Sequence, residues 1–385
     1  MRTPKLRFPE FQDAGEWEEE DLGAISNNIS SGKDKNDPNG VHDLFGSTGV
    51  IGKTSSDTYN GKFLLVARVG ANAGLLTKAN GKFGVTDNTL VIHLKKTAWI
   101  DFFFYYLDNL NLNKLIFGSG QPLITGGQLK ALSLYLPSDV EQQKIADCLS
   151  SLDELINAQA QKLDMLKAHK KGLMQQLFPA EGENLPILRF PEFRNAGEWE
   201  EYFGNDLFEQ ISDRNPDPYL PVLAITQESG AIPRDAINYH VSVTEKSIES
   251  YKVVQVGDFI ISLRSFQGGI EHSSYHGICS PAYVILRRLI KGSDIYFKQY
   301  FKTDRFIRLL TKNLEGLRDG KMISYKQFSE LLLPVPKSAE QQKIAECLSS
   351  LDEMIRAQTQ KLDSLKAYKK GLMQQLFPAL DEVRE

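Results

Sequence analysis

Two short stretches contain residue types that could support metal or phosphate chemistry. His272, His276 and Cys279 have a spacing that could begin a zinc site. No fourth ligand is evident, and structural zinc sites normally close with four, so a surface loop is the preferred interpretation. The segment STGVIGKT, from Ser47 to Thr54, nearly matches a phosphate-binding loop. Ser47 replaces the first glycine and no apolar strand precedes it, so we interpret this segment as a glycine-rich turn.

A third stretch, NPDPY at Asn215, is similar to the NPPY motif of amino-methyltransferases. Asp217 separates the two prolines, and no glycine-rich cofactor loop precedes the motif. The sequence also offers no carboxylate pair with a nearby lysine of the nuclease type, and no nucleophile with an identifiable base. We therefore predict that this chain is not an enzyme, and that it holds no metal and no cofactor of its own.

Composition indicates a folded, soluble chain with more than one domain. Apolar residues make up 41% and charged residues 24% of the 385 positions. Residues 1–20 lack the pattern of a signal peptide, and no apolar run approaches the roughly 18 residues of a membrane span. We expect a cytoplasmic protein in which the three cysteines are reduced.

The formal net charge of −4 argues against nucleic-acid binding, but the charges are unevenly distributed. Between Leu286 and Lys321, ten basic residues stand against four acidic ones. This segment is either a nucleic-acid-binding patch or an ordinary solvated helix face.

The sequence contains two internal repeats. Residues 137–180 and 336–379 are identical at 35 of 44 positions, at a constant offset of 199. The motif LRFPEF-x-x-AGEWEE occurs at Leu6 and again at Leu188. Each half of the chain therefore has an opening motif, a variable block and a shared segment, in that order.

The shared segment has the heptad pattern of helices that pair along a narrow seam. Gln159 and Lys170 interrupt the apolar seam, and Gln358 and Lys369 repeat them. An amphipathic helix of this length cannot bury its own apolar stripe, so we expect the two copies to pair antiparallel within the chain; a homodimer is the alternative. The predicted seam consists of Ile145, Leu149, Leu152, Ile156, Leu163 and Leu166, with Ile344, Leu348, Leu351, Ile355, Leu362 and Leu365.

The variable blocks share an order of elements although their residues differ. Short β-type runs end at glycine-rich turns, and a helical stretch follows at 99–116 in the first block and at 294–314 in the second. In each block, a strand ending at Arg68 or Arg264 enters a glycine-rich loop. Each block also has a predicted capping box, Thr125-x-x-Gln128 and Ser324-x-x-Gln327, which either holds phosphate at free amides or simply caps a helix.

In these features the chain resembles, over essentially its full length, the specificity subunit of type I restriction-modification systems. The resemblance rests on the EQQKIA-x-CLSSLDE signature present twice, the long helix after each copy, and the diverged blocks before them. It implies an α+β fold in which two target recognition domains are joined by two long helices, forming an antiparallel intramolecular coiled coil with pseudo-two-fold symmetry. The expected boundaries are recognition domains at 1–136 and 181–335, and spacer helices at 137–180 and 336–385.

The resemblance also implies a function and partners. Each recognition domain would read one half of an asymmetric, bipartite site in double-stranded DNA, and the helices would set the spacing and dock two modification subunits. The full complex would add two restriction subunits. S-adenosylmethionine, ATP and Mg would belong to the partner subunits. A coiled-coil adaptor without DNA specificity, or a self-contained DNA-modifying enzyme, are the alternatives.

Arginine and lysine bind phosphates, while arginine, asparagine and glutamine read purine edges. Position in polar loops gives the predicted DNA-binding residues. They are Lys53, Arg68, Asn72, Lys78, Asn88 and Gln121 in the first block, and Arg234, Arg264, Gln267, Arg318, Lys321 and Lys326 in the second.

Overall fold

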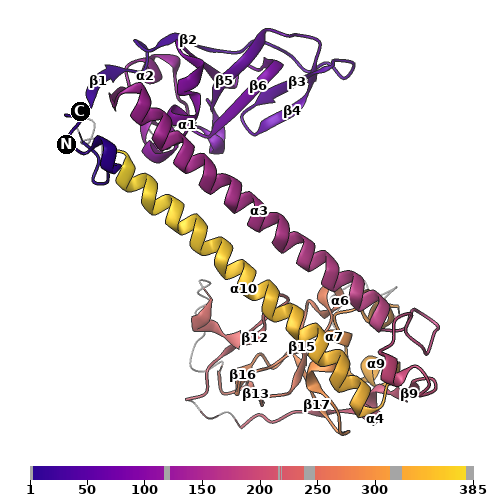
Figure 1. The fold of residues 1–385 in the computed structure, drawn as a ribbon. Coiled ribbons are helices and arrows are strands. Elements are labelled where there is room, and N and C mark those ends of the chain that lie inside the picture. Colours follow the sequence, from indigo (N-terminus) through magenta and orange to yellow (C-terminus); the bar gives the residue numbers. More distant parts are fainter. Residues whose placement is uncertain are drawn as a thin grey trace. The chain divides into compact units, whose positions relative to one another are not determined.

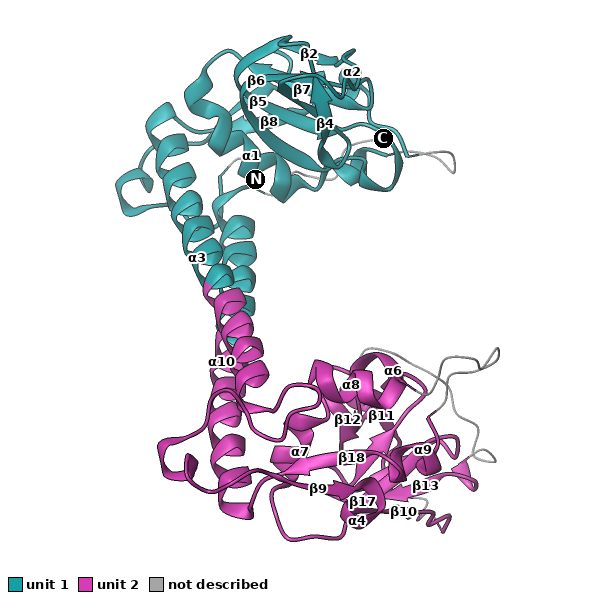
Figure 2. Ribbon diagram, turned by 90° about the vertical axis from the view of Figure 1, so that its right-hand side faces the viewer, with its two compact units in different colours: residues 1–161, 359–385 teal, residues 162–358 magenta. Residues whose placement is uncertain are grey.

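The computed structural model describes residues 3–116, 122–215, 217, 219–237, 248–312 and 323–378. The chain divides into two compact units (Figure 2). Unit 1 comprises residues 1–161 and 359–385, and unit 2 comprises residues 162–358. These bounds differ from the predicted ones because each unit takes half of each long helix. Within the described residues, no helix combines the length and apolarity needed to cross a bilayer.

Unit 1 is built on a six-stranded sheet with the order β2-β7-β5-β6-β3-β4, beside the two-stranded pair β1-β8. All neighbouring strands are antiparallel except β3 and β6. The strands are β1 (Glu18–Asp21), β2 (Ser26–Ser31), β3 (His42–Gly46), β4 (Gly49–Thr54), β5 (Tyr59–Ala67), β6 (Leu76–Val85), β7 (Thr89–Leu94) and β8 (Ser133–Leu136). The helices are η1 (Pro9–Phe11), η2 (Gly70–Asn72), η3 (Thr97–Trp99), α1 (Ile100–Leu110), η4 (Leu112–Leu115) and α2 (Gly126–Lys130).

The central strands of this sheet bury both faces. Leu64 and Val66 of β5 join the larger core with α1, whereas Phe63 and Leu65 join a smaller aromatic cluster with Phe83 on the other face. This follows from the alternation of side chains along a strand. A strand buried on both faces reads as a continuous apolar run, as FLLVARV does.

Unit 2 is built on smaller sheets, which are β10-β17-β14-β15, β11-β12, β13-β16 and β18-β9. The strands are β9 (Glu200–Phe203), β10 (Phe208–Ile211), β11 (Leu223–Thr226), β12 (Gly230–Pro233), β13 (Lys252–Val254), β14 (Phe259–Ile261), β15 (Glu271–His272), β16 (Gly277–Cys279), β17 (Val284–Arg288) and β18 (Leu332–Val335). The helices are η5 (Pro191–Phe193), α4 (Gly204–Leu207), η6 (Arg234–Ala236), α6 (Ser265–Gly268), α7 (Asp294–Tyr300), α8 (Asp304–Thr311) and α9 (Tyr325–Ser329). The predicted strands and the predicted helical stretches are therefore confirmed in both blocks.

Each shared segment forms one continuous helix of 39 residues, α3 (Asp139–Leu177) and α10 (Ser338–Leu376) (Figure 1). In unit 1, the start of α3 lies against the end of α10, where Lys369 Nζ is 2.6 Å from Asp153 Oδ1. In unit 2, the end of α3 lies against the start of α10, where Lys170 Nζ is 2.6 Å from Asp352 Oδ1. The antiparallel, intramolecular pairing is therefore confirmed.

The predicted seam residues face the interior of their own units. Ile145 and Leu149 belong to the core of unit 1, and Ile344 and Leu348 belong to the core of unit 2. The other eight seam residues are buried or half-buried. The ends of the helices are buried as well, and Phe377 stacks on Tyr106 with ring centroids 4.8 Å apart.

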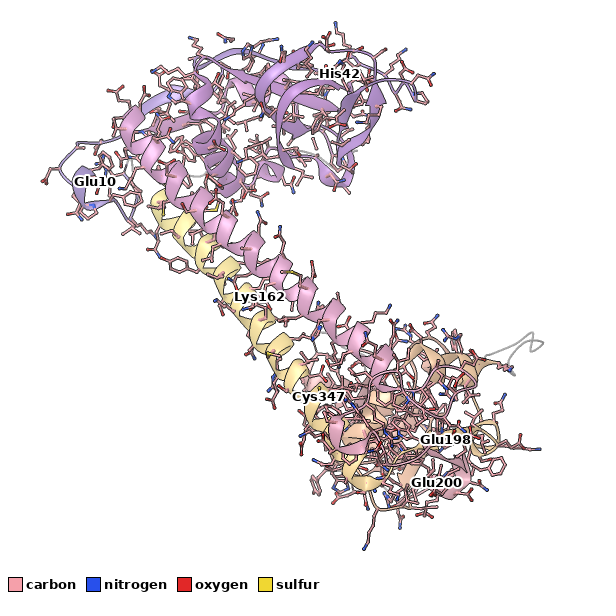
Figure 3. All side chains as sticks on the ribbon, turned by 45° about the vertical axis from the view of Figure 1, so that its right-hand side comes forward. Glu10, His42, Lys162, Glu198, Glu200 and Cys347 are labelled. Atoms are coloured by element: carbon pink, nitrogen blue, oxygen red, sulfur yellow. The ribbon has the colours of Figure 1, made fainter. Side chains whose placement is uncertain are left out.

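The opening motifs fold back onto the long helices. Arg7 forms a two-bond ion pair with Glu141 at the start of α3, with both nitrogen–oxygen distances 2.7 Å. Arg189 forms the equivalent pair with Glu340 of α10. Other motif residues, including Glu10 in unit 1 and Glu198 and Glu200 in unit 2, lie in the opening segments of their units (Figure 3). The ion pairs between the opening motifs and the long helices were not predicted. The presence of the opening motif and of the helix segment in both halves of the chain could have indicated them.

Breaking one of these ion pairs should be costly, because the side chain of Glu141 is only 1% exposed. Arg7→Met leaves a buried carboxylate without its partner and should lower the free energy of unfolding by about 3 kcal/mol, measured by urea denaturation. The matched control is Lys144→Met, which breaks a half-exposed pair with Glu10 and should lower the stability much less than Arg7→Met does. Equal effects of the two substitutions would contradict the assignment.

Candidate nucleic-acid interface

Three loops of unit 1 meet where strand β5 ends, and we call this set loop cluster 1 (residues 68–74, 86–88 and 122–125). The backbone N–H of Arg68 donates to the carbonyl of Asn88 at 2.9 Å, and that of Ile124 donates to the carbonyl of Arg68 at 2.8 Å. The N–H of Gly70 donates to Pro122. Backbone hydrogen bonds therefore bring the predicted residues Arg68 and Asn88 together.

The glycine-rich part of loop cluster 1 passes close to the segment after α1. Gly74 has φ +93°, and a Cβ at this position would lie 2.5 Å from Asn113 Oδ1 and 2.8 Å from its backbone nitrogen. Only glycine meets both requirements. The exposed side chains that this loop presents include Asn72, and Arg68 beside it is half-buried with its Nε atom unpartnered.

Unit 2 has a corresponding loop after β14 that contacts residue 227, and we call this set loop cluster 2 (residues 227 and 262–269). Arg264 and Gln267 are exposed at its surface, at the start of α6 and within it. Gln227 Nε2 donates to the carbonyl of Arg264 at 3.3 Å. Gly269 has φ +79°, and a Cβ here would overlap the carbonyl of Phe301 at 1.9 Å. A glycine again permits the close approach of a loop to a helix.

A half-buried lysine holds loop cluster 2 in place. Lys302 Nζ donates to the carbonyl of Gly268 at 2.9 Å, and it pairs with the buried carboxylate of Glu271. Burial lowers the pKa of Lys302 and raises that of Glu271, because desolvation disfavours both charges. This anchor was missed from the sequence, since nothing in the spacing of Lys302 and Glu271 signals their contact.

Both predicted capping boxes are confirmed. Thr125 Oγ1 accepts from the N–H of Gln128, and Gln128 Oε1 accepts from the N–H of Thr125. Ser324 and Gln327 make the same two bonds. The helices they start are only five residues long, so these residues act as plain caps.

The remaining predicted DNA-binding residues are spread more widely. Lys53 on β4 pairs with Asp43, and Lys78 on β6 pairs with Asp101 and lies over the ring of Phe104. Arg234 is half-buried in η6, with its Nη1 atom unpartnered. Lys326 is exposed in the first turn of α9. Gln121, Arg318 and Lys321 lie outside the described residues.

Two arginines at the start of the basic segment between 286 and 321 are neutralised inside unit 2. Arg287 pairs with the buried carboxylate of Asp258, and Arg288 pairs with Asp294. These contacts stabilise the sheet and α7, so the segment is less basic at its surface than its composition indicates.

The three stretches considered for chemistry have structural explanations where they are described. His272 lies in β15 and Cys279 in β16, and both are buried, so the surface-loop interpretation was wrong for these two residues. It is confirmed for His276, which is exposed between the two strands. Within the described ranges, no three His, Cys, Asp or Glu side chains are grouped so as to hold a metal. The stretch from Ser47 to Thr54 is a turn only at its start, because residues 47 and 48 connect the β3–β4 hairpin and Gly49–Thr54 is strand β4. The interpretation as a glycine-rich turn was therefore wrong for most of the stretch. Residues 216 and 218 lie outside the described ranges.

A family model described as the type I restriction modification DNA specificity domain matches the chain twice, at residues 15–168 and 197–367. The chain belongs to this family. Each match covers the end of one opening motif, one loop cluster and most of one long helix. The fold class predicted from the resemblance is thereby supported by an independent comparison.

Among curated relatives, the chain is similar to the Escherichia coli type I restriction enzyme EcoprrI specificity subunit. The two are 32% identical over 118 residues, and this alignment covers 31% of this chain and 29% of that protein. The chain is 24% identical over 265 residues to the putative type I restriction enzyme MjaX specificity subunit of Methanocaldococcus jannaschii, covering 67% of this chain and 61% of that one. The match to the MjaVIII specificity subunit of the same organism is 25% identical over 335 residues and covers 80% and 76%. The chain thus matches about a third to three quarters of the length of these relatives.

Two solved structures share the fold. The crystal structure of a type I restriction-modification S subunit from M. genitalium aligns with a TM-score of 0.62 and 17% identity, over 98% of this chain and 100% of that one. A chain from a structure describing complex assembly and conformational transition of the type I system aligns with a TM-score of 0.54 and 16% identity, over 94% and 98%.

Burial of His272 beneath loop cluster 2 predicts a pH-dependent stability. Desolvation is the main cause that lowers its pKa from 6.5 to about 4, and the nearby charge of Lys298 adds to it. Between those two values, the unfolded chain binds a proton that the folded chain does not, so acid favours unfolding. Lowering the pH from 6.5 to 4 should therefore remove up to about 3 kcal/mol of stability that the variant His272→Phe does not lose. Urea denaturation at several pH values measures this, and parallel curves for the two proteins would contradict it.

Proposed function

We propose that this chain is the DNA-specificity subunit of a type I restriction-modification complex, in which each unit reads one half of an asymmetric, bipartite DNA site. The observation that carries the proposal is the double family match, which places one loop cluster within each copy. The two loop clusters occupy equivalent positions in their units, yet they present different side chains. Two different readers on one chain fit a target with two different halves.

The chemistry of the exposed loops supports DNA reading. Asn72 and Asn88 in loop cluster 1, and Gln267 in loop cluster 2, are amides that can make paired hydrogen bonds to adenine. Arg264 can bind guanine with two bonds or bind a phosphate. Because glycine backbones and buried anchors fix these loops, the side chains would meet DNA from a preorganised surface.

The parts that are alike in both halves support docking of a partner that is present twice. A groove of about 250 Å³ in unit 1 is lined by Arg7, Pro137 and Glu141. A groove of about 330 Å³ in unit 2 is lined by their counterparts Arg189, Pro336 and Glu340. Two modification subunits would dock on these surfaces and the adjoining helices, and two restriction subunits would complete the assembly. Those partners would supply S-adenosylmethionine, ATP and Mg, and this chain would act without catalysis, in the cytoplasm.

A coiled-coil adaptor without DNA specificity is the competing function. It accounts for the paired helices and the matched grooves, but it gives no reason for two loop clusters that keep their backbone scaffold and differ in their exposed polar residues. A self-contained DNA-modifying enzyme is disfavoured by the family match, because that match is to a specificity domain.

A genome-wide map of adenine methylation tests the proposal directly. A host expressing this chain together with its modification subunit is compared with a host expressing the modification subunit alone. One split, asymmetric motif should appear only when this chain is present. Identical maps in the two hosts would favour the adaptor.

A single substitution tests loop cluster 2. Arg264→Ala removes an exposed cation and should weaken DNA binding by the assembled complex about tenfold at moderate salt, with a smaller salt dependence of the affinity. Lys78→Ala is the comparison variant, because Lys78 is also a predicted DNA-binding residue but pairs with Asp101, and its loss should change the affinity less than twofold. Fluorescence anisotropy with a duplex carrying the mapped site measures both. Unchanged affinity in Arg264→Ala would remove this residue from the interface.

A further inference from the structure

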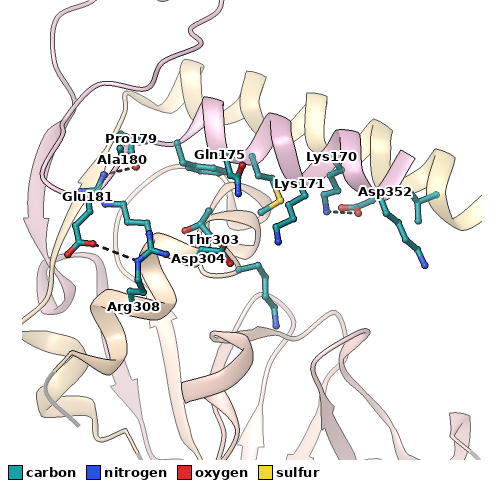
Figure 4. A pocket seen from close by; sticks show the side chains of 16 residues that line it. Lys170, Lys171, Gln175, Pro179, Ala180, Glu181, Thr303, Asp304, Arg308 and Asp352 are labelled. Atoms are coloured by element: carbon teal, nitrogen blue, oxygen red, sulfur yellow. Dashed lines mark hydrogen bonds and ion pairs between the residues drawn. The ribbon is translucent and has the colours of Figure 1, made fainter. Parts of the chain in front are cut away.

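Unit 2 contains a cavity of about 570 Å³ between the end of α3 and the start of α8 (Figure 4). Its size is that of a small-molecule site. The wall from α3 includes Lys167, Lys171 and Met174, and the wall from the recognition domain includes Arg305 and Arg308.

The cavity has more positive than negative charge. Six cations line it against three carboxylates. Some of these charges are already balanced, because Lys170 pairs with Asp352 and Lys302 pairs with Glu271 outside the cavity. The cations that line it are Lys167, Lys170, Lys171, Lys302, Arg305 and Arg308, and the carboxylates are Glu181, Asp304 and Asp352.

Three of the cations are available to a ligand. Lys167 and Lys171 are exposed one helical turn apart on α3, and within the described part of the chain neither has a hydrogen bond or ion pair. Arg308 faces Glu181 across a 3.7 Å contact in which both side chains are 63% exposed, a pair of little strength in water. Figure 4 shows Lys171 and Arg308 on the two sides of the cavity.

A fourth cation is fixed at the side of the cavity. Arg305 Nη1 donates to the carbonyls of Pro179 and Glu183 at 2.9 and 3.0 Å, which joins the chain after α3 to α8. Its charge is held by neutral acceptors rather than by a carboxylate, so the positive charge is not cancelled there. A rigid cation beside mobile ones is suited to the several oxygens of a phosphate group.

Unit 1 repeats this charge pattern only in part, although the helical wall is the same. The counterparts of Lys167, Lys170 and Lys171 on α10 are Lys366, Lys369 and Lys370. The recognition-domain wall differs. Tyr105 and Gln299 hold equivalent seam aspartates, and in the register that they define Asp108 corresponds to Lys302 and Asn111 to Arg305. In the same register Lys114 corresponds to Arg308, so the three available cations recur in unit 1. The cations Lys302 and Arg305 do not recur, and the fixed arginine beside the available cations is therefore particular to unit 2.

We propose that this cavity binds the phosphate groups of a ligand that the chain takes up once, at unit 2. The ligand chemistry is phosphate, and its source is either a free nucleotide-sized molecule or the backbone of duplex DNA. Apolar atoms of Met174 and Phe178 in the same cavity suit a ligand that carries a ring or sugar beside its phosphates. The site goes beyond the proposed function, since reading a DNA sequence does not require it.

The test compares two triple variants of the full chain. Lys167→Gln, Lys171→Gln and Arg308→Gln remove the available cations of the cavity. Lys366→Gln, Lys370→Gln and Lys114→Gln remove exposed cations at the corresponding positions of unit 1 and form the matched control. All six side chains are exposed, so both proteins should fold, which circular dichroism verifies.

Three probes separate the sources of phosphate. Pyrophosphate and a nucleoside triphosphate are titrated by calorimetry, and a 30-base-pair duplex without the recognition site is titrated by anisotropy. We expect the cavity variant to bind at least one class of probe ten times more weakly than the wild type, and the control variant to stay within twofold. Loss confined to the small probes identifies a free ligand, and loss confined to the duplex identifies the DNA backbone. Equal affinities of the two variants for every probe would overturn the proposal.

The same variants separate this inference from the proposed function. The methylation map of the cavity variant should show the same split motif as the wild type, because neither loop cluster has been changed. A missing motif in the wild type itself would instead count against the proposed function and leave the phosphate titrations interpretable.

Discussion

One carboxylate in each unit joins the three elements on which the rest of that unit depends. Asp153 accepts from Lys369 of α10 on one oxygen and from the Tyr105 hydroxyl of α1 on the other, at 2.6 and 2.7 Å. Asp352 accepts from Lys170 of α3 and from Gln299 of α7 at the same distances. The lysines occupy seam positions where an apolar residue would pack better. A polar residue at such a position fixes the register of paired helices at some cost in stability.

The register of the two paired helices is symmetric with respect to the sequence repeat. Adding the repeat offset of 199 to Asp153 and Lys170 gives Asp352 and Lys369, so the two ion pairs join the same two repeat positions. The helix ends then complete the cores. Phe377, from the second copy of the segment, packs against Phe102 and Tyr106 in unit 1, and Phe178, from the first copy, packs against Tyr296 in unit 2. Each unit needs a helix end from the other copy to fill its core, so folding of the two halves is coupled.

The parts of this fold that could be predicted are those specified by local periodicity or by repetition. The heptad spacing predicted α3 and α10, and the apolar runs predicted strands such as β5 and β14, because these patterns depend only on residues near in sequence. The offset between repeats predicted which helix pairs with which. Contacts of long sequence separation were not accessible in the same way. Arg7 reaches Glu141 and Lys302 reaches Gly268 only once the chain has folded back, and neither spacing has a period that marks it.

Prediction of the candidate site from the sequence was limited in the same way. Arg264 and Gln267 could be selected because a strand followed by a glycine-rich loop places them at the surface. Lys78 satisfied the same composition rule, yet it lies against α1, because the alternation along β6 directs its side chain towards Asp101 and Phe104. Sequence alone identifies a polar residue in a loop or at a strand end, but the face that it occupies depends on register.

The two loop clusters are held in place by different residues. A loop that presents polar side chains must be held firmly without occupying its own surface. In unit 1 this is achieved by backbone bonds between Arg68, Asn88 and Ile124, with Gly74 close against Asn113. In unit 2 the ammonium group of Lys302 holds the loop at Gly268, and Glu271 compensates its charge. Because the supporting bonds go largely to backbone atoms, the exposed side chains can change without loss of the support. Recognition can then diverge between the halves while the helices and opening motifs remain alike.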